Sequence, residues 1–184
     1  MRFTATSLSG VIVIEPEPLG DERGWFARTF DVEELSSRGM NPGVVQANAS
    51  FNASEGTLRG MHYQAEPYGE SKIVRCVRGA AFDVAIDLRP DSPAYLRWYG
   101  VELSEDDGLA LYIPAGLAHG FQTLRANSEL HYLMGAAYVA DAARGVRWDD
   151  PAFGIDWPVA PPGGRIISAR DASYPDYAPP SARR

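Results

Sequence analysis

The sequence predicts an all-β protein with one or a few short peripheral helices. Two observations predict it: apolar and polar residues alternate along short segments, and turn-forming residues separate these segments at short intervals. In the clearest segment, residues 82–88, every second side chain is apolar, so those side chains share one face of a strand. Asp83 and Asp87 lie between them, and we expect both to line a solvated or polar face of the sheet. Many short strands separated by turns are typical of a sandwich or barrel.

One helix is expected, over residues 32–38. Asp31 is a suitable N-cap, Glu34 follows three residues later as in a capping box, and Gly39 can end the helix. From residue 158 onward proline and glycine become frequent, which predicts a peripheral C-terminal wrap over 158–184 with a frayed end over 179–184. The length of 184 residues fits a single domain over 1–184.

Composition narrows the class of protein. The chain is 45% hydrophobic and 22% charged, proportions typical of a globular protein. A formal net charge of −7 argues against nucleic acid or a membrane surface as a partner, although a local arginine cluster can still attract an anionic small molecule. The single cysteine, Cys76, cannot form an internal disulfide, and neither a signal peptide nor a membrane span is recognisable. We therefore expect a cytoplasmic protein.

One motif specifies the type of β fold. Gly108, Pro114, Gly116 and His119 have the spacing G-x5-P-x-G-x2-H, which is the second consensus stretch of cupin jelly rolls. This spacing predicts a strand that runs into a tight turn and presents His119 to the interior of a barrel. The predicted fold class is accordingly a cupin-type double-stranded β-helix.

A second motif bears on metal binding. His62 stands where metal-binding cupins carry a His-x-His pair, but the residue two positions later is Gln64. Without the second histidine the metal box is incomplete, so we expect His62 to act as a base rather than as a metal ligand.

Strand alternation sorts the polar residues by direction. Tyr132 alternates in phase with apolar neighbours and is expected to face the interior, whereas His131 is expected to point outward. His119 and Lys72 are also expected to face inward. An inward lysine is informative, because its burial is costly unless the ammonium group is paired or used.

Arg59 and His62 differ in strand parity. Both can serve one pocket only if the strand bends or bulges near Gly60, where a glycine would permit it. Each of these polar residues, taken singly, also has a purely structural explanation, and only their combination indicates a site.

Several stretches in order along the chain carry a resemblance to a known family. They are residues 21–26, 46–48, 57–64, 72–76, 82–84, 118–121 and 150–158. On these stretches the chain resembles the dTDP-4-dehydrorhamnose 3,5-epimerase family over residues 10–176. The resemblance implies a jelly-roll homodimer that needs no metal and no cofactor. Its implied reaction is the epimerisation of a nucleotide-linked 4-keto-6-deoxyhexose, with dTDP-4-dehydro-6-deoxy-D-glucose giving dTDP-4-dehydro-L-rhamnose.

The resemblance also implies roles for individual residues. His62 would be the base that takes a proton from carbon 3 or carbon 5, and Asp171 would orient the His62 ring and favour its protonated form. Tyr132 would donate a proton to the opposite face of the sugar, and Lys72 would stabilise the enolate between the two steps. Residues implied in substrate binding are Arg23, Phe26, Gln46, Asn48, Arg59, His119 and Tyr138, with the two arginines on the diphosphate or nucleotide.

The chain departs from the family pattern at a few positions. Arg28 stands where many members carry glutamate. It could pair with a surface acid or add a phosphate contact, and we expect the phosphate contact. Ala143 replaces a glutamate before Arg144, and the loop between Asn48 and Arg59 is one residue longer. These departures concern nucleotide contacts and leave the acid–base residues intact.

Three alternatives stay open on the sequence. A related epimerase could invert only one centre of a similar sugar nucleotide. A metal-dependent cupin oxygenase or isomerase could use His62, Glu70 and His119, although the charge of Lys72 would repel a cation there. A jelly roll that binds a sugar nucleotide without catalysis would need the pocket but no acid–base pair.

Overall fold

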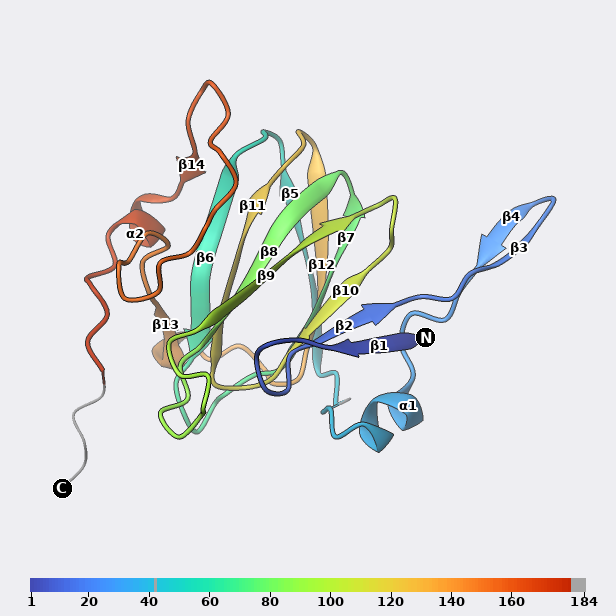
Figure 1. Cartoon of the computed structure of the whole chain (residues 1–184), viewed down its shortest axis with the longest axis horizontal. Helices are drawn as coiled ribbons and strands as arrows, with labels where there is room; N and C mark the ends of the chain where they lie inside the picture. Colours follow the sequence, from blue (N-terminus) through green and yellow to red (C-terminus); the bar gives the residue numbers. More distant parts are fainter. Residues whose placement is uncertain (42, 180–184) are drawn as a thin grey trace.

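Two antiparallel sheets face each other and enclose the main core (Figure 1). The computed structural model describes residues 1–41 and 43–179. The first sheet has the order β1 (Arg2–Ala5), β2 (Ile12–Glu15), β10 (Ala110–Ile113), β7 (Lys72–Arg78), β12 (Ser128–Met134) and β5 (Gln46–Asn52). The second has the order β13 (Ala143–Gly145), β6 (Thr57–Gln64), β11 (Leu117–Thr123), β8 (Ala80–Asp87) and β9 (Trp98–Ser104). A short strand, β14 (Ile166–Ile167), runs parallel to β6.

The remaining elements lie outside the two sheets. A separate hairpin, β3 (Leu19–Asp21) with β4 (Gly24–Phe26), extends away from them, and the helical elements are α1 (Val32–Ser37), a 3-10 turn (Ala140–Ala142) and α2 (Ala169–Ala172). The predicted helix is confirmed: the side chain of Asp31 caps α1 by accepting a hydrogen bond from Glu34 N. No helix within the described residues has the length and apolar character needed to cross a membrane.

The turn that the G-x5-P-x-G-x2-H motif predicted is confirmed. Its residues form β10, a turn in which Gly116 has a φ of +86°, and β11, which carries His119 inward. This left-handed conformation is unfavourable for any residue other than glycine. A Cβ at Gly116 would also come within 2.6 Å of Arg89 Cγ.

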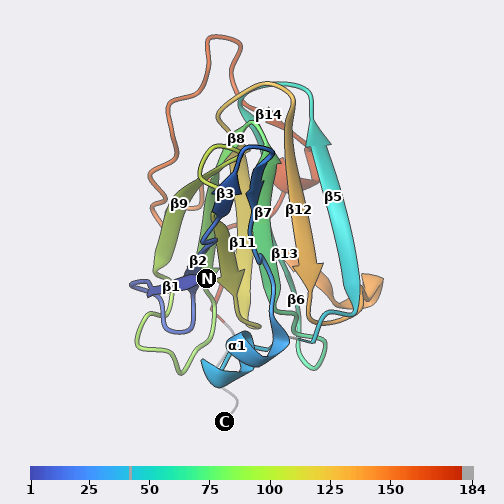
Figure 2. The same ribbon diagram turned by 90° about the vertical axis from the view of Figure 1, so that its right-hand side faces the viewer.

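Apolar side chains fill three layers. The main cluster lies between the sheets and includes Val74, Leu103, Leu111 and Phe121. A second cluster covers the outer face of β8 and β11, and a third packs α1 on the outer face of the first sheet (Figure 2). Both faces of β8 are therefore buried, which makes its alternating polar residues part of the interior.

This double burial corrects one expectation. Asp83 and Asp87 are both 0% exposed and do not line a solvated face. Alternation along a strand separates its two faces, but it does not reveal that a second sheet covers one face and a later segment covers the other.

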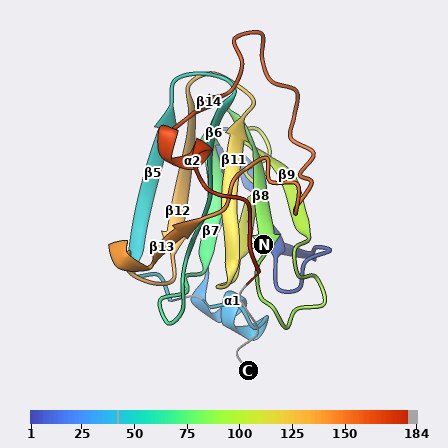
Figure 3. The same cartoon turned by 90° about the vertical axis from the view of Figure 1, so that its left-hand side faces the viewer.

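The C-terminal segment supplies that outer cover. It runs along the outer side of β6, β11 and β8 (Figure 3). Phe153, Trp157 and Tyr177 pack against the outward side chains of β6 and β8, and the indole of Trp157 donates a hydrogen bond to Trp148 O. Val146 and Phe153, which precede residue 158, are also buried under this cover. Of the predicted frayed end, residues 180–184 lie outside the described part of the chain.

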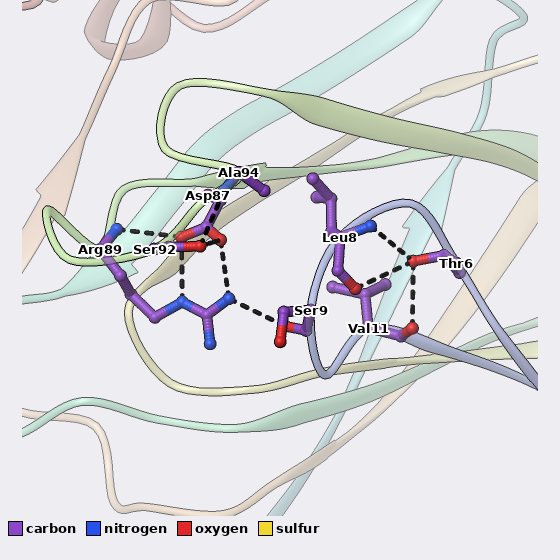
Figure 4. Close-up of polar contacts among 8 residues, drawn as sticks. All are labelled: Thr6, Leu8, Ser9, Val11, Asp87, Arg89, Ser92 and Ala94. Carbon is purple, nitrogen blue, oxygen red and sulfur yellow. Dashed lines mark hydrogen bonds and ion pairs between the residues drawn. The ribbon is translucent and has the colours of Figure 1, made fainter.

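A buried carboxylate and its arginine partner connect two loops at one end of the barrel (Figure 4). Asp87 accepts hydrogen bonds from Arg89 Nε at 2.9 Å, Arg89 Nη2 at 2.7 Å and Ser92 Oγ at 2.6 Å. Arg89 Nη2 also donates to Ser9 O at 2.8 Å, which links the β8–β9 connection to the turn between β1 and β2. Burial by itself would raise the pKa of Asp87, but the hydrogen bonds from Arg89 and Ser92 outweigh burial and lower it.

We expect Asp87→Asn to lower the free energy of unfolding at pH 7 by about 1.5–3 kcal/mol, because it weakens charge-assisted hydrogen bonds. The folded-state pKa of Asp87 is depressed, so the wild-type carboxylate contributes stability above about pH 4 and loses it as the pH falls further. Urea unfolding of both proteins at pH 7 and pH 3 measures this. The difference should shrink at pH 3, and an equal difference at both pH values would contradict the assignment. Asp91→Asn, in the same connection but exposed, is the matched control.

Candidate active site

A bulge in β6 brings two residues of opposite strand parity to one cavity. Arg59 pairs with Phe121 and His62 pairs with His119, so three steps along β6 match two steps along β11. The bend expected near Gly60 is therefore confirmed. Arg59 and His62 both line a cavity of about 440 Å³, together with Thr57, Leu58, Ile166, Ile167, Ser168, Arg170 and Asp171.

Gly60 makes this bulge possible. Its φ is +119°, and a Cβ there would lie 2.6 Å from Gly120 Cα and 2.7 Å from His119 O. Since these atoms belong to the backbone of the adjacent strand, they cannot move aside as a side chain could. Only glycine fits at this position.

Asp171 connects the bulge to His62. One carboxylate oxygen lies 2.7 Å from His62 Nε2, and the other accepts a hydrogen bond from Gly60 N at 3.2 Å. Ser168 caps the short helix α2 that carries Asp171, which is 5% exposed. Burial would raise the pKa of Asp171, but the hydrogen bonds from His62, Gly60 and Ser168 lower it. Asp171 is therefore ionised at neutral pH and orients a half-exposed imidazole.

The facing sheet contributes a tyrosine. Tyr132, on β12, points inward and its hydroxyl lies 3.1 Å from Ser50 Oγ on β5. Burial raises the pKa of Tyr132 well above its ordinary value, although the hydrogen bond with Ser50 opposes this effect. The phenol therefore keeps its proton at neutral pH. His131, the neighbouring residue on β12, is exposed, as expected.

A second histidine–carboxylate pair lies in the interior. His119 Nε2 lies 2.8 Å from Asp83 Oδ2, and both side chains are buried. The ring of His119 packs edge-on against the ring of Tyr132 with 6.1 Å between centroids. The pair thus packs directly against Tyr132 in the interior.

Lys72 is buried at the start of β7, as its strand parity predicted. Its ammonium group contacts Glu70 Oε1, and the two residues are 6% and 8% exposed. Burial lowers the pKa of Lys72, and the negative charges of Glu70 and, to a lesser extent, Asp83 oppose that decrease. A smaller cavity of about 130 Å³ is lined by Glu70 together with His62, Tyr63, Gln64, Tyr138, Ala143, Arg144 and Arg170.

Gln46, Asn48 and Tyr138 lie together at the edge of the first sheet. Gln46 donates to Asn48 Oδ1 at 3.0 Å and accepts a hydrogen bond from Tyr138 N at 3.2 Å. Asn48 is the strand partner of Tyr132, so β5 places this polar pair next to the tyrosine. Tyr138 is 58% exposed at the mouth of the smaller cavity.

The structure does not bring the early candidates Arg23, Phe26 and Arg28 to this cavity. Arg23 sits at the tip of the β3–β4 hairpin and pairs with Asp21, and the hairpin extends away on the side opposite α2 and β14 (Figure 1). Arg28 does not contact the pocket either, and its guanidinium pairs with the N-cap residue Asp31 at 2.9 Å.

Sequence reasoning missed three functional neighbours: Asp83 as the partner of His119, Glu70 as the partner of Lys72, and Arg170. Glu70 and Lys72 are two residues apart, a spacing that puts extended side chains on the same side and could have indicated the pair. Arg170 lines both cavities and directly precedes Asp171. No comparable signal links Asp83 to His119, because the two residues are 36 positions apart.

The residues of the metal-dependent alternative are all engaged elsewhere. His62 contacts Asp171, Glu70 contacts Lys72, and His119 contacts Asp83. Across residues 1–41 and 43–179, no group of three or more His, Cys, Asp or Glu side chains is arranged to hold a metal ion.

Comparisons with known proteins give a consistent result. The family model described as dTDP-4-dehydrorhamnose 3,5-epimerase matches residues 5–178. The dTDP-4-dehydrorhamnose 3,5-epimerase of Sinorhizobium fredii is 44% identical over 95% of this chain and 89% of its own length. The crystal structure of the Elizabethkingia anophelis enzyme of that name has a TM-score of 0.92 at 34% identity, covering 96% of each chain. That of the Bacillus anthracis enzyme, with TDP and PPi bound, has a TM-score of 0.90 at 36% identity, covering 96% of this chain and 99% of its own. The predicted cupin-type fold class is confirmed by these likenesses.

We expect Gly60→Ala to destabilise the protein far more than Gly24→Ala. Both glycines have a similar positive φ, +119° and +126°, but a Cβ at Gly24 meets nothing within 4 Å. The strain of the backbone conformation is thus common to both variants, and the overlap with the backbone of β11 should cost a further 1–3 kcal/mol or so, about the cost of overpacking. Urea unfolding of the two variants measures the difference. Equal losses would show that β6 and β11 can separate at no cost.

Proposed function

The chain belongs to the dTDP-4-dehydrorhamnose 3,5-epimerase family, and on that premise we propose that it converts dTDP-4-dehydro-6-deoxy-D-glucose to dTDP-4-dehydro-L-rhamnose. The reaction inverts carbons 3 and 5 of the sugar, both of which adjoin the carbon 4 ketone. Each inversion removes a proton from one face and returns a proton to the other, with no net oxidation or reduction. The enzyme is thus an isomerase that works by proton exchange.

The observation that carries this proposal is the placement of His62 and Tyr132 on opposite sheets. His62 comes from β6 and Tyr132 from β12, so a sugar between the sheets meets a base from one side and an acid from the other. His62, held by ionised Asp171, takes the proton from the carbon beside the ketone. The electron pair moves onto the ketone oxygen and forms an enolate. Tyr132, which keeps its proton at neutral pH, donates to the opposite face and completes the inversion.

Lys72 supplies the positive charge that an enolate needs. A preorganised ammonium group in a site without water stabilises a developing negative charge far better than it would in solvent. Arg59 lines the larger cavity, where its guanidinium suits the diphosphate. We assign Gln46, Asn48, His119 and Tyr138 to sugar and nucleotide binding, and Tyr138 lines the smaller cavity beside His62. The TDP and PPi bound to the Bacillus anthracis relative support a thymidine nucleotide as the carrier.

The β3–β4 hairpin supports a homodimer. Leu19, Trp25 and Phe26 are 76%, 70% and 75% exposed, an apolar surface that a lone protomer leaves in water. Arg23 and Phe26 lie on a hairpin that extends away from its own barrel, and Arg28 pairs with Asp31. In the proposed dimer we assign all three to the pocket of the partner. There Arg23 and Arg28 would meet the nucleotide or its phosphates.

We propose that the protein works in the cytoplasm. Cys76 is free and buried, and burial raises the pKa of its thiol to about 11, which keeps it in the unreactive protonated form. A lone reduced cysteine suits a reducing environment.

We expect solvent deuterium at both carbon 3 and carbon 5 when the protein acts on dTDP-4-dehydro-6-deoxy-D-glucose in D2O with EDTA present. His62→Ala should lower the exchange rate by about 10²–10⁴-fold, because a positioned base contributes about that much. Mass spectrometry and proton NMR of the sugar nucleotide measure both. Label at one carbon alone would assign a single-centre epimerase, and loss of activity with EDTA would favour the metal-dependent alternative.

Tyr132→Phe separates catalysis from binding. The variant should bind the nucleotide as the wild type does but invert the sugar about 10²–10⁴-fold more slowly, since only the proton donor is removed. Calorimetric binding and turnover measured on one preparation test this. Turnover in Tyr132→Phe equal to that of the wild type would remove Tyr132 as the proton donor. A wild type that binds the nucleotide but exchanges no deuterium would point to a binding protein.

Mixing two inactive variants should restore activity if the hairpin acts on the partner. In a His62→Ala and Arg23→Ala mixture, half of the randomly exchanged dimers pair one chain of each kind, and each such dimer has one intact site. About a quarter of wild-type activity should therefore return. A hairpin that served its own barrel would leave the mixture inactive, and light scattering should show a dimer throughout.

A further inference from the structure

We propose that Glu70 is a positioning residue for this reaction: its buried carboxylate holds the ammonium group of Lys72 in place and charged beside the cavity that contains His62. The inference rests on the proposed function, because it assigns Glu70 a task only if Lys72 stabilises the enolate.

The composition of the chain makes Lys72 exceptional. Of the 17 basic residues one is lysine and the other 16 are arginine, so Lys72 carries the only side-chain amine in the protein. A guanidinium stays protonated in proteins, whereas an ammonium group can lose its proton when it is buried. Among the lysine and arginine residues, the one that can be discharged is thus the one buried against Glu70 at the start of β7.

The contact with Glu70 is direct and shielded from water. Lys72 Nζ meets Glu70 Oε1, and the side chains are 6% and 9% exposed. With so little water available, the carboxylate is the group that compensates the buried charge. Glu70 also lines the small cavity with His62 and Tyr138, which places the ion pair at the reacting end of the pocket.

Other charged groups face Lys72 from neighbouring elements. Asp83, on β8, is near enough to influence it, but its carboxylate is already engaged with His119. Tyr132 on β12 is neutral, and the cavity beside Glu70 adds His62, Arg144 and Arg170. Glu70, which is in direct contact with Lys72, contributes more than Asp83 to keeping the ammonium group charged.

This arrangement predicts how Lys72 titrates. Burial lowers the pKa of Lys72, and the contact with Glu70 counteracts burial. Removing the charge of Glu70 leaves burial opposed by Asp83 alone. The ammonium group should then lose its proton at a lower pH than in the wild type.

The test uses the single lysine as its own reporter. Full-length protein labelled with carbon-13 lysine gives one set of lysine side-chain NMR signals, which is followed with pH in the wild type, Glu70→Gln and Glu66→Gln. Glu70→Gln should lower the titration midpoint of Lys72 by about one pH unit or more, the usual effect of a close opposite charge. Glu66→Gln, an exposed acid four residues earlier, should leave the midpoint unchanged. An unchanged midpoint in Glu70→Gln would overturn the proposal.

The pH dependence of turnover separates positioning from a merely structural role. For Glu70→Gln, the pH at which the rate falls on the alkaline side should shift to a lower value, together with the titration midpoint of Lys72. The rate at pH 6 should stay within a few-fold of wild type. Glu70→Asp, which keeps the carboxylate, should move this alkaline fall in rate part of the way back toward its wild-type pH. A uniform loss of rate at every pH, without a shift, would assign Glu70 a structural role and defeat the inference.

The two proposals can fail separately. The NMR titration needs no substrate, so it decides whether Glu70 holds the charge of Lys72 whatever the protein turns over. A wild type that exchanges no deuterium would remove the proposed function, and with it the catalytic purpose of the pair.

Discussion

The close approach of β6 and β11 at two glycines is the constraint on which the pocket depends. Gly60 and Gly120 face each other so closely that a Cβ on Gly60 would lie 2.6 Å from Gly120 Cα, and one on Gly120 would lie 2.6 Å from Arg59 O. The bulge at this point turns Arg59 and His62 toward the same cavity. Asp171 then binds both the backbone N–H of Gly60 and the ring of His62. The bulge at Gly60 thereby sets the positions of His62, its carboxylate partner and the guanidinium of Arg59.

Around this feature the interior carries its charges in pairs. Asp171 lies against His62, Glu70 against Lys72, and Asp83 against His119. Burying a lone charge is costly, and a partner within hydrogen-bond distance offsets much of that cost. Pairing therefore lets a jelly roll with an apolar core hold ionisable groups between its sheets.

Sequence patterns predicted the local elements well and the site unevenly. The capped helix, the glycine turn before His119, the inward Tyr132 and Lys72, and the bulge at Gly60 all follow from residues near one another in the chain. The contact of Asp171 with His62 spans 109 positions, and only the family resemblance pointed to it. Asp83 and Asp87 were expected on a solvated or polar face and are fully buried, because alternation cannot show that both faces of β8 are covered.

The sequence by itself determined the elements, the turn that presents His119 and the family of the chain. These depend on backbone conformation and on hydrogen bonds between residues a few positions apart. Only the tertiary structure decided which polar side chains lose their water, which charges meet, and that the β3–β4 hairpin points away from its own barrel. The physical reason is that burial and electrostatic pairing arise when segments distant in sequence pack together, and a linear pattern does not contain those distances.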